Sequence, residues 1–423
     1  RTSNVRVVFV PTSVLTRLCC GWPRGAMLNQ RLDLLKDYPF QRLRDLVAAV
    51  APPPGLAPIA MSLGEPQHAY PDLVGDVLHA NRHLYGKYPP LAGTDEFRRA
   101  VAAWLTRRYK LPAGMIEPDR HVLPVAGTRE GLYMIAFVAV PESKGGRKPA
   151  VLMPNPFYQC YAGAAVSAGA EPIYLAALPR HGFLPDLDAL DEATLARSAM
   201  VYLCSPANPQ GTVADLDYLK RLIGLARAHD FVLVLDECYT EIYTGMPPPG
   251  GLEACAALGG SLKNVMVFHS LSKRSSVPGL RSGFCAGDPD IVSVFARLRS
   301  HGNAGNPLPV FAAAAALWRD ETHVLANRAL YQEKFRIAES IIGNRFGFYK
   351  PPGGFFLWLD VGDGEAAAKE LYRKAAVTVL PGRYLTREAG EGTAAGRPYI
   401  RVALVNDAAT TREALERLRD ALG

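Results

Sequence analysis

The chain has 423 residues, 49% of them hydrophobic and 21% charged, which is typical of a globular protein with a large core, and the sequence holds no run of 18 apolar residues that would span a membrane. Part of the net charge of +7 comes from four arginines in the first 26 residues, and no long Lys/Arg run is present, so nothing in the charge pattern indicates nucleic-acid binding. The seven cysteines are scattered without C-x-x-C spacing, which argues against a metal site and favours reduced thiols in the cytoplasm.

Residues 1–26 begin with basic residues, contain an apolar run at 7–10 and end near a cysteine pair, a weak likeness to a secretion signal. Pro11 and Arg17 interrupt the apolar stretch. We therefore expect Met27 to be the natural start and residues 1–26 to be a disordered extension, either upstream sequence or non-native, that takes no part in the fold.

The next segments lead toward a candidate pocket. Apolar positions at helical spacing predict a helix over residues 32–50, which three prolines end. Residues 59–66 read as a short strand and a turn, where Gly64 would let a substrate approach the backbone; an ordinary turn glycine explains the same pattern. Tyr88 lies in a loop before an amphipathic helix over residues 96–109.

A repeating order of apolar strand, turn and helix then begins. The predicted strands cover residues 121–125, 151–153, 172–175, 200–204, 231–235 and 265–268. Short buried strands alternating with helices predict an α/β fold with a doubly wound, mainly parallel sheet, whose ligands bind at the carboxyl ends of the strands.

The pattern changes after about residue 320. A long polar helix at 321–342 precedes predicted strands at 355–359, 378–380 and 399–403 and a closing helix. We expect two domains: a large one over residues 67–320 that contains the predicted sheet and its ligand-binding edge, and a smaller α+β domain built from residues 27–66 and 321–423.

Lys273 follows the strand at 265–268, close to the hydroxyls of Ser270 and Ser272 and the guanidinium of Arg281. A partly desolvated amine can lose its proton and attack a carbonyl, and the hydroxyls and guanidinium suit a phosphate. Pyridoxal 5′-phosphate, an aldehyde that carries a phosphate, would use all four groups. A lysine in a polar turn is the simpler alternative. Residues 270–273 also fit the S-x-x-K motif of penicillin-binding enzymes, but its companions S-D-N and K-T-G are absent from the sequence.

Other polar residues follow the neighbouring strands. Asp236 ends the strand at 231–235, and a buried carboxylate needs a cationic partner such as a protonated pyridine nitrogen; a helix cap or an ion pair is the alternative. Asn208 follows the strand at 200–204, where its amide would donate to a phenolate oxygen or simply form an Asn-Pro turn. Gly127 and Thr128 open a helix over residues 130–138, and a helix start of small residues is a potential anion site.

Taken together, these motifs resemble the class I/II aminotransferases of the fold-type I pyridoxal-phosphate enzymes. The resemblance runs from about Leu28 to the C-terminus and rests on Asn208-Pro209-x-Gly211, Asp236-x-x-Tyr239, Ser270-x-Ser272-Lys273 and Gly279-x-Arg281-x-Gly283. It implies that Lys273 bonds covalently to pyridoxal 5′-phosphate and then moves a proton between the substrate Cα and the cofactor. It also implies that Asp236 pairs with the pyridine nitrogen, while Asn208 and Tyr239 bond the phenolate oxygen.

The same resemblance assigns the rest of the site. Tyr158 stacks on the cofactor ring, and the phosphate binds Ser270, Ser272, Arg281 and the backbone of Gly127 and Thr128. Tyr88 reaches that phosphate from the other subunit of a homodimer. Arg401 holds the substrate α-carboxylate beside the backbone of Gly64 and the side chain of Asn208. Two positions depart from the family pattern: Gln210 replaces a threonine, and Arg129 stands where a smaller or amide side chain is usual, so Arg129 contacts either the phosphate or the substrate.

A narrower resemblance points to the bacterial N-succinyldiaminopimelate aminotransferases. The segments that carry it are 125–130, 154–161, 271–279 and 301–303. It implies amino-group exchange between glutamate/2-oxoglutarate and N-succinyl-2-amino-6-oxopimelate in lysine biosynthesis. The acceptor has several carboxylates, so Arg129 or Arg274 is expected to bind its far end. An aspartate, aromatic or kynurenine aminotransferase is the alternative.

Two rival classes are disfavoured. Residues 362–367 fit the G-x-G-x-x-A dinucleotide fingerprint, but the next predicted strand is not followed by a ribose-binding acid. Transcription regulators that use the aminotransferase fold carry a helix-turn-helix module ahead of it, and residues 1–26 lack the helical periodicity for one.

Overall fold

The computed structural model describes residues 28–36, 38–302, 305–388 and 392–423. The extension expected at residues 1–26 lies outside the described residues, as does Asn303, the last residue of one segment that carries the narrower resemblance. Among the helices of the described ranges, none is both long and apolar enough to cross a membrane.

A seven-stranded sheet forms the centre of the larger part of the chain, with the order β2-β8-β7-β6-β5-β3-β4. Its strands are β2 (Val122–Val125), β3 (Ala150–Asn155), β4 (Glu171–Ala176), β5 (Ser198–Cys204), β6 (Val232–Asp236), β7 (Val265–Ser270) and β8 (Gly283–Gly287). Neighbouring strands from β4 to β7 pair in parallel, whereas β8 runs antiparallel to both β2 and β7. The α/β prediction with a mainly parallel sheet is therefore confirmed. The sequence reading missed β8, whose Gly-Phe-Cys-Ala-Gly sequence has no β-branched residue.

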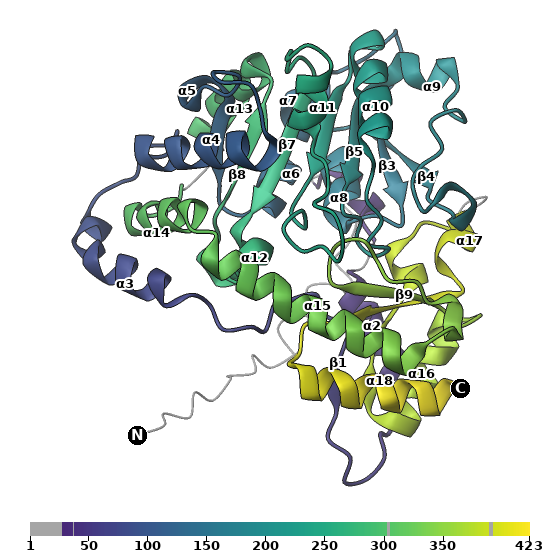
Figure 1. Cartoon of the computed structure of the whole chain (residues 1–423). Coiled ribbons are helices and arrows are strands. Elements are labelled where there is room, and N and C mark those ends of the chain that lie inside the picture. The colour runs from purple at the N-terminus through teal and green to yellow at the C-terminus, as the bar shows by residue number, and fades with distance from the viewer. Residues whose placement is uncertain (1–27, 37, 303–304, 389–391) are drawn as a thin grey trace.

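Helices cover both faces of this sheet, as Figure 1 shows. They are α3 (Asp72–Ala80), α4 (Asp95–Tyr109), α5 (Pro118–His121), α6 (Thr128–Met134), α7 (Ala136–Ala139), α8 (Gln159–Ser167), α9 (Glu192–Arg197), α10 (Leu216–Ala228), α11 (Gly251–Ala257), α12 (Leu271–Arg274), α13 (Pro289–Gly302) and α14 (Leu308–Arg319). Every residue of β3, β5 and β7 is buried, because both faces of these strands are covered.

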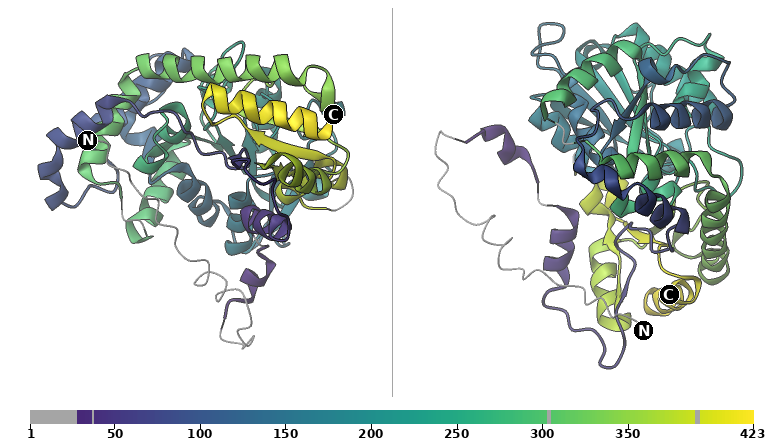
Figure 2. Two further views of the ribbon diagram at one scale, coloured as in Figure 1. Left: turned by 90° about the horizontal axis from the view of Figure 1, so that it is seen from below. Right: turned by 90° about the vertical axis from the view of Figure 1, so that its left-hand side faces the viewer.

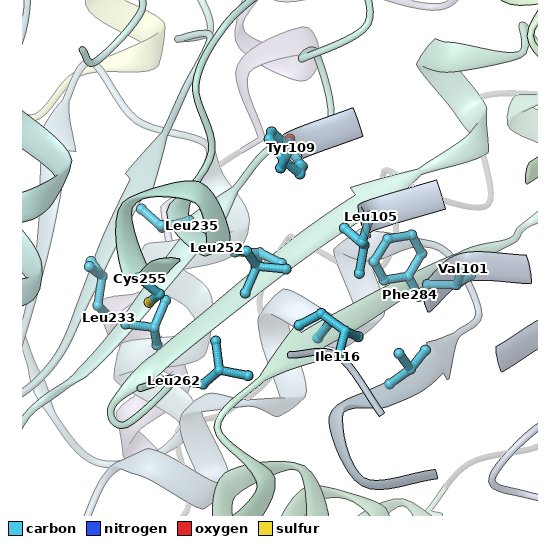
Figure 3. Packing of buried hydrophobic residues seen from close by; sticks show 14 of the residues in the cluster. Val101, Leu105, Tyr109, Ile116, Leu233, Leu235, Leu252, Cys255, Leu262 and Phe284 are labelled. Atoms are coloured by element: carbon cyan, nitrogen blue, oxygen red, sulfur yellow. The ribbon is translucent and has the colours of Figure 1, made fainter. Parts of the chain in front are cut away.

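Two apolar clusters lie on the two faces of the sheet. One joins α4, α10, α11 and α14 to the strands, and Figure 3 shows part of it, including Val101 and Leu105 of α4 beside Phe284 of β8. The other joins α6, α8 and α13 to the opposite side chains of the same strands. Because the core holds the strands on both faces, the strand ends that carry the polar residues are fixed in position.

The rest of the chain forms smaller sheets. A three-stranded antiparallel sheet has the order β11-β12-β9, and β1 pairs in parallel with β10. The elements are β1 (Ile59–Ala60), β9 (Phe356–Asp360), β10 (Val377–Thr378), β11 (Leu380–Pro381), β12 (Tyr399–Ala403), α2 (Pro39–Val47), α15 (Thr322–Ile342), α16 (Gly364–Ala375), α17 (Gly392–Gly396) and α18 (Ala408–Leu422). The two long helices α15 and α18 lie side by side (Figure 2). A separate apolar core unites Ile59 and Met61 with residues after 334. This packing supports the domain division at residues 66/67 and 320/321, which remains our proposal.

Two local predictions need correction. The helix predicted over residues 32–50 is a 3-10 turn, η1 (Gln30–Leu34), followed by the separate helix α2, which Pro39 begins because its fixed φ suits a first helical position. The helix predicted over 130–138 divides into α6 and α7. At the dinucleotide-like motif, the Asp363 carboxylate accepts the N–H groups of Glu365 and Ala366, so a carboxylate already occupies the helix end where a phosphate would bind.

Candidate active site

A cavity of about 500 Å³ opens where the carboxyl ends of β5, β6 and β7 face the smaller sheets. The predicted site residues that line it are Gly64, Thr128, Arg129, Tyr158, Asn208, Asp236, Tyr239, Ser270, Ser272, Lys273, Arg281 and Arg401. Gly127 and Tyr88 do not line this cavity. The structure thus brings together residues from both ends of the sequence, and Tyr88, which is fully exposed, lies apart from them in its own subunit.

Lys273 projects from α12, which begins directly after β7. The Ser270 hydroxyl caps this short helix by accepting the N–H of Ser272 at 3.1 Å. The Lys273 ammonium donates to the carbonyl of Gly64 at 2.7 Å and lies 5.3 Å from the centre of the Phe355 ring. Burial, together with the nearby Arg401 guanidinium, lowers the pKa of Lys273 to about 8. The amine is therefore far easier to deprotonate than an exposed lysine.

Asp236 ends β6 and is 5% exposed. Its carboxylate accepts the hydroxyl of Tyr161 at 2.6 Å and the N–H of Cys238 at 3.4 Å. Within the part of the chain that the structure describes, no cationic side chain forms an ion pair with it, and burial raises its pKa. A buried carboxylate in this state is stabilised by any cation that enters the cavity.

The sequence reading gave no role to Tyr161, the partner of Asp236. It belongs to α8, and its ring stacks on that of Tyr202 at 4.4 Å with an interplanar angle of 11°. This stacking fixes the hydroxyl on the Asp236 carboxylate. No local sequence pattern predicts the contact between Tyr161 and Asp236, because this contact depends on how α8 crosses the sheet.

Arg401 of β12 reaches the cavity from the smaller sheet. Its guanidinium donates to the Asn208 Oδ1 at 3.0 Å and to the Ser62 carbonyl at 2.7 Å, and Asn208 in turn donates to the Tyr239 hydroxyl at 3.4 Å. The side chain is 4% exposed, and its Nε has no hydrogen-bond partner among the described residues. Burial lowers the pKa of Arg401 to about 10. This desolvated cation is well suited to an anionic ligand.

The end of the cavity near α6 has the donors that a phosphate requires. Thr128 is the first residue of α6, and Ser270, Ser272 and Arg281 line the same cavity. Gly127 lies next to the Arg281 guanidinium: its φ is 82°, and a Cβ there would come within 2.0 Å of that group. Glycine is needed at this position because of both the backbone angle and the close approach of Arg281.

Arg129 and Tyr158 lie together at another side of the cavity. The Arg129 guanidinium donates to the hydroxyl of Tyr158 and, at 3.1 Å, to that of Tyr38. The second arginine considered for the far end of the substrate is elsewhere. Arg274 is 2% exposed beside Trp104 and Trp318 and donates to the Leu317 carbonyl and to Glu321, so the expectation that it binds substrate is wrong.

Comparison with known proteins identifies this arrangement. The family profile described as "Aminotransferase class I and II" matches residues 59–422. The LL-diaminopimelate aminotransferase of Desulforudis audaxviator is 31% identical over 403 residues, covering 93% of this chain and 97% of that protein. The crystal structure of an aminotransferase from Neisseria meningitidis is 41% identical, with a TM-score of 0.89 over 94% of this chain and 100% of that one. A probable N-succinyldiaminopimelate aminotransferase from Thermus thermophilus has the same fold, with a TM-score of 0.79 at 24% identity over 90% of this chain and 100% of that one.

The profile match covers most of the chain, and the first of these relatives aligns over almost its full length. The chain therefore belongs to the class I and II aminotransferases, a family of enzymes that depend on pyridoxal 5′-phosphate.

Proposed function

We propose that this aminotransferase exchanges an amino group between glutamate/2-oxoglutarate and N-succinyl-2-amino-6-oxopimelate in lysine biosynthesis. The observation that carries the proposal is Arg129. Its guanidinium lines the cavity in addition to that of Arg401, and among the described residues its side-chain partners are the neutral hydroxyls of Tyr38 and Tyr158. Arg129 is therefore free to pair with a second carboxylate, and both proposed substrates carry one beyond the α-carboxylate.

The residues of the cavity fit pyridoxal 5′-phosphate. Asp236 has no cationic partner among the described residues, so its carboxylate is available to a protonated pyridine nitrogen. Ser270, Ser272 and Arg281 supply hydrogen-bond donors for a phosphate. Asn208 and Tyr239, which line the cavity and hydrogen-bond each other, would bond the phenolate oxygen, and Tyr158, also in the lining, would cover the ring. When bound, the cofactor supplies an electron sink for the bond broken at the substrate Cα.

The side chains of this chain would then act as follows. Lys273 would hold the cofactor through its Nζ. Once the substrate has displaced it, the free amine would take the proton from the substrate Cα and deliver it to the cofactor carbon on the other side of the transferred nitrogen. Asp236 keeps the pyridine nitrogen protonated, because its own charge is buried and otherwise uncompensated. Arg401 holds the α-carboxylate, so that the Cα proton lies within reach of Lys273.

We also propose a homodimer in which the exposed Tyr88 reaches the partner's phosphate site, and a cytoplasmic location. Tyr88 is fully exposed and outside its own cavity, as this role requires, although the same exposure suits a surface tyrosine.

LL-Diaminopimelate is a second candidate substrate, because the Desulforudis relative bears that name. Its far end carries an ammonium as well as a carboxylate, and Glu65 is an acidic residue at the same cavity that would attract the ammonium. The decisive experiment assays 2-oxoglutarate with N-succinyl-LL-diaminopimelate, LL-diaminopimelate, aspartate, phenylalanine and kynurenine as amino donors. The proposal requires the highest kcat/KM for the succinylated donor; a higher value for any other donor would replace it.

Replacing Arg129 by glutamine tests the second carboxylate site directly. We expect kcat/KM for glutamate to fall about tenfold or more, through KM, because an ion pair in a partly desolvated cavity is lost. Alanine, which has no second carboxylate, serves as the matched substrate and should react at an unchanged rate. Equal losses for glutamate and alanine would show that Arg129 serves the cofactor instead.

Replacing Arg401 by leucine should lower kcat/KM for every amino donor, including alanine, by about a hundredfold or more, because the buried bidentate partner of the α-carboxylate is lost. The half-reaction with each donor can be followed by the absorbance of the cofactor. Arg412→Leu, which removes an exposed arginine from the neighbouring helix α18, is the control and should match the wild type. A loss in Arg401→Leu that is confined to dicarboxylic donors would contradict the assignment.

A further inference from the structure

A line of three polar side chains, two of them buried and one half-buried, ends on the helix that carries Lys273. Because α12 has only four residues, the carbonyl groups at its end lack partners within the helix. Asn327 of α15 supplies them: its Nδ2 donates to the carbonyl of Lys273 at 3.1 Å and to that of Arg274 at 3.2 Å. Asn327 is 7% exposed, so water does not replace it easily. Asn327 therefore caps the end of the helix that carries the reactive amine.

The hydrogen bonds behind Asn327 have one consistent direction. Since its amide nitrogen donates to two carbonyls, its Oδ1 accepts from His68, whose Nδ1 lies 2.7 Å away. His68 then carries its proton on Nδ1, and the lone pair of its Nε2 faces the Lys334 Nζ at 2.7 Å. Lys334 donates to that lone pair and to the Asn406 carbonyl at 2.8 Å. Lys334 therefore orients the His68 ring, His68 orients the Asn327 amide, and Asn327 holds the backbone carbonyl of Lys273.

Lys334 is an unusual residue to bury. It is 1% exposed, and it has no carboxylate within ion-pair distance in the described ranges. Burial lowers the pKa of Lys334 to about 7; Asp407 and Glu333 are the charged groups that counteract this. The ring of Tyr331 lies beneath both members of the pair, 4.5 Å from the Lys334 Nζ and 4.5 Å from the His68 ring. Burying an amine without a carboxylate partner costs stability, so stability alone does not account for it.

The segment that carries His68 contacts the Lys273 turn at two further places. The Gly64 carbonyl accepts from the Lys273 Nζ at 2.7 Å, and the His68 carbonyl accepts from the Ser276 hydroxyl at 3.0 Å. The side chains of Lys273 and Ser276 thus both donate to carbonyls of residues 64–68, and Asn327 donates to the carbonyls of Lys273 and Arg274 from α15.

We propose that Lys334, His68 and Asn327 form a positioning relay that sets the direction and the environment of the Lys273 amine. This inference rests on the proposed role of Lys273 as the amine that bonds the cofactor. When the relay is broken, the end of α12 loosens and the Nζ leaves its place against Gly64. The amine then becomes better hydrated, holds its proton more tightly and captures the cofactor aldehyde more slowly.

The test uses the full-length protein freed of cofactor. The capture of added pyridoxal 5′-phosphate, in which an amine and an aldehyde form a C=N bond and release one water, is followed by absorbance from pH 6 to 10. Wild type should reach half of its limiting rate near the pKa of Lys273, about 8. Asn327→Leu should capture about tenfold more slowly at neutral pH and should show a midpoint about one pH unit higher, because the amine returns toward an ordinary lysine pKa.

A matched pair of variants at His68 separates positioning from general stability. His68→Asn places an amide nitrogen where Nδ1 was, so it can still donate to Asn327 but no longer accepts from Lys334, and it should match Lys334→Met and lie between wild type and Asn327→Leu. His68→Gln places its amide near Nε2 instead and should behave like Asn327→Leu. Asn81→Leu removes a comparable amide that donates to the Val77 carbonyl at the end of α3, and it is the control. It should lower the thermal midpoint without moving the pH midpoint of capture.

The outcomes are distinct. If Asn327→Leu, Lys334→Met and His68→Gln lower only the thermal midpoint and leave the pH midpoint of capture at the wild-type value, the relay is structural and our inference is wrong. If the variants at the buried Asn327 and Lys334 fail to fold, the two His68 variants still test the inference, because His68 is only half buried and its substitution disturbs the core less. Covalent capture that persists in Lys273→Ala would instead overturn the proposed role of Lys273, and the relay with it.

Discussion

Lys273→Ala should lower the rate of amino-group exchange by about four orders of magnitude or more. The substitution removes both the covalent attachment of the cofactor and the base that moves the substrate proton, and each contributes a large factor. The residual rate should be measured by single-turnover absorbance with glutamate. Borohydride reduction followed by mass spectrometry should find the cofactor on residue 273 of the wild type and on no lysine of the variant.

Two control variants show that the loss comes from this one amine. Lys263→Ala removes an exposed lysine outside the cavity and should leave both measurements unchanged. Lys273→Arg keeps the positive charge in the cavity but not the nucleophile, and it should be as inactive as Lys273→Ala. A Lys273→Arg variant with wild-type activity would refute the covalent role.

Asp236→Asn should reduce kcat by about three orders of magnitude. The carboxylate is buried at the end of β6, and the amide keeps its shape but cannot balance a protonated pyridine nitrogen, which removes a buried ion pair. The affinity for pyridoxal 5′-phosphate should fall as well, which an equilibrium titration of the apoprotein measures separately from turnover. Since only the charge changes, the cavity should keep its shape.

Tyr161→Phe provides a graded comparison with Asp236→Asn. It removes the hydroxyl that donates to Asp236 at 2.6 Å but leaves the carboxylate and the ring stacking on Tyr202 in place. A loss of about tenfold is expected, the effect of one hydrogen bond to a buried charge. If Asp236→Asn cost no more than Tyr161→Phe, the carboxylate would not be acting as the partner of the ring nitrogen.

The strands with continuous apolar runs are readable from the sequence, since a strand covered on both faces must be apolar throughout, as in β5 and β7. The short strand β8 is not, because its pairing with β2 and β7 stabilises a sequence that has little strand preference of its own. Its antiparallel direction likewise follows from the connection of residues 271–282, which returns the chain beside β7, rather than from any residue within β8.

The residues of the candidate site likewise divide into those that the sequence predicts and those that only the structure reveals. Asp236 can be found from the sequence because an acid that ends an apolar run is conspicuous. Its contact with Tyr161, the close approach of Arg281 to Gly127 and the cap that Asn327 provides all join residues far apart in the chain. Such contacts depend on how helices cross the sheet, which local patterns do not determine. The burial of Arg274 likewise depends on α14 and could not be read from the motif beside it.

The helix α15 has a mechanical consequence for the catalytic cycle. Near its start Arg328 donates to Glu241 in the loop after β6, while its later residues Phe335 and Ile341 belong to the apolar core of the small sheets. A helix of 21 residues is a stiff rod of roughly 30 Å. A movement of the small sheets over a bound substrate would therefore rotate α15 as a rigid unit. Its first turns, where Asn327 contacts the backbone of Lys273, would lie close to the axis of that rotation. Opening and closing of the cavity would then change the position of the Lys273 amine. Substrate entry would in this way be coupled to the reactivity of that amine.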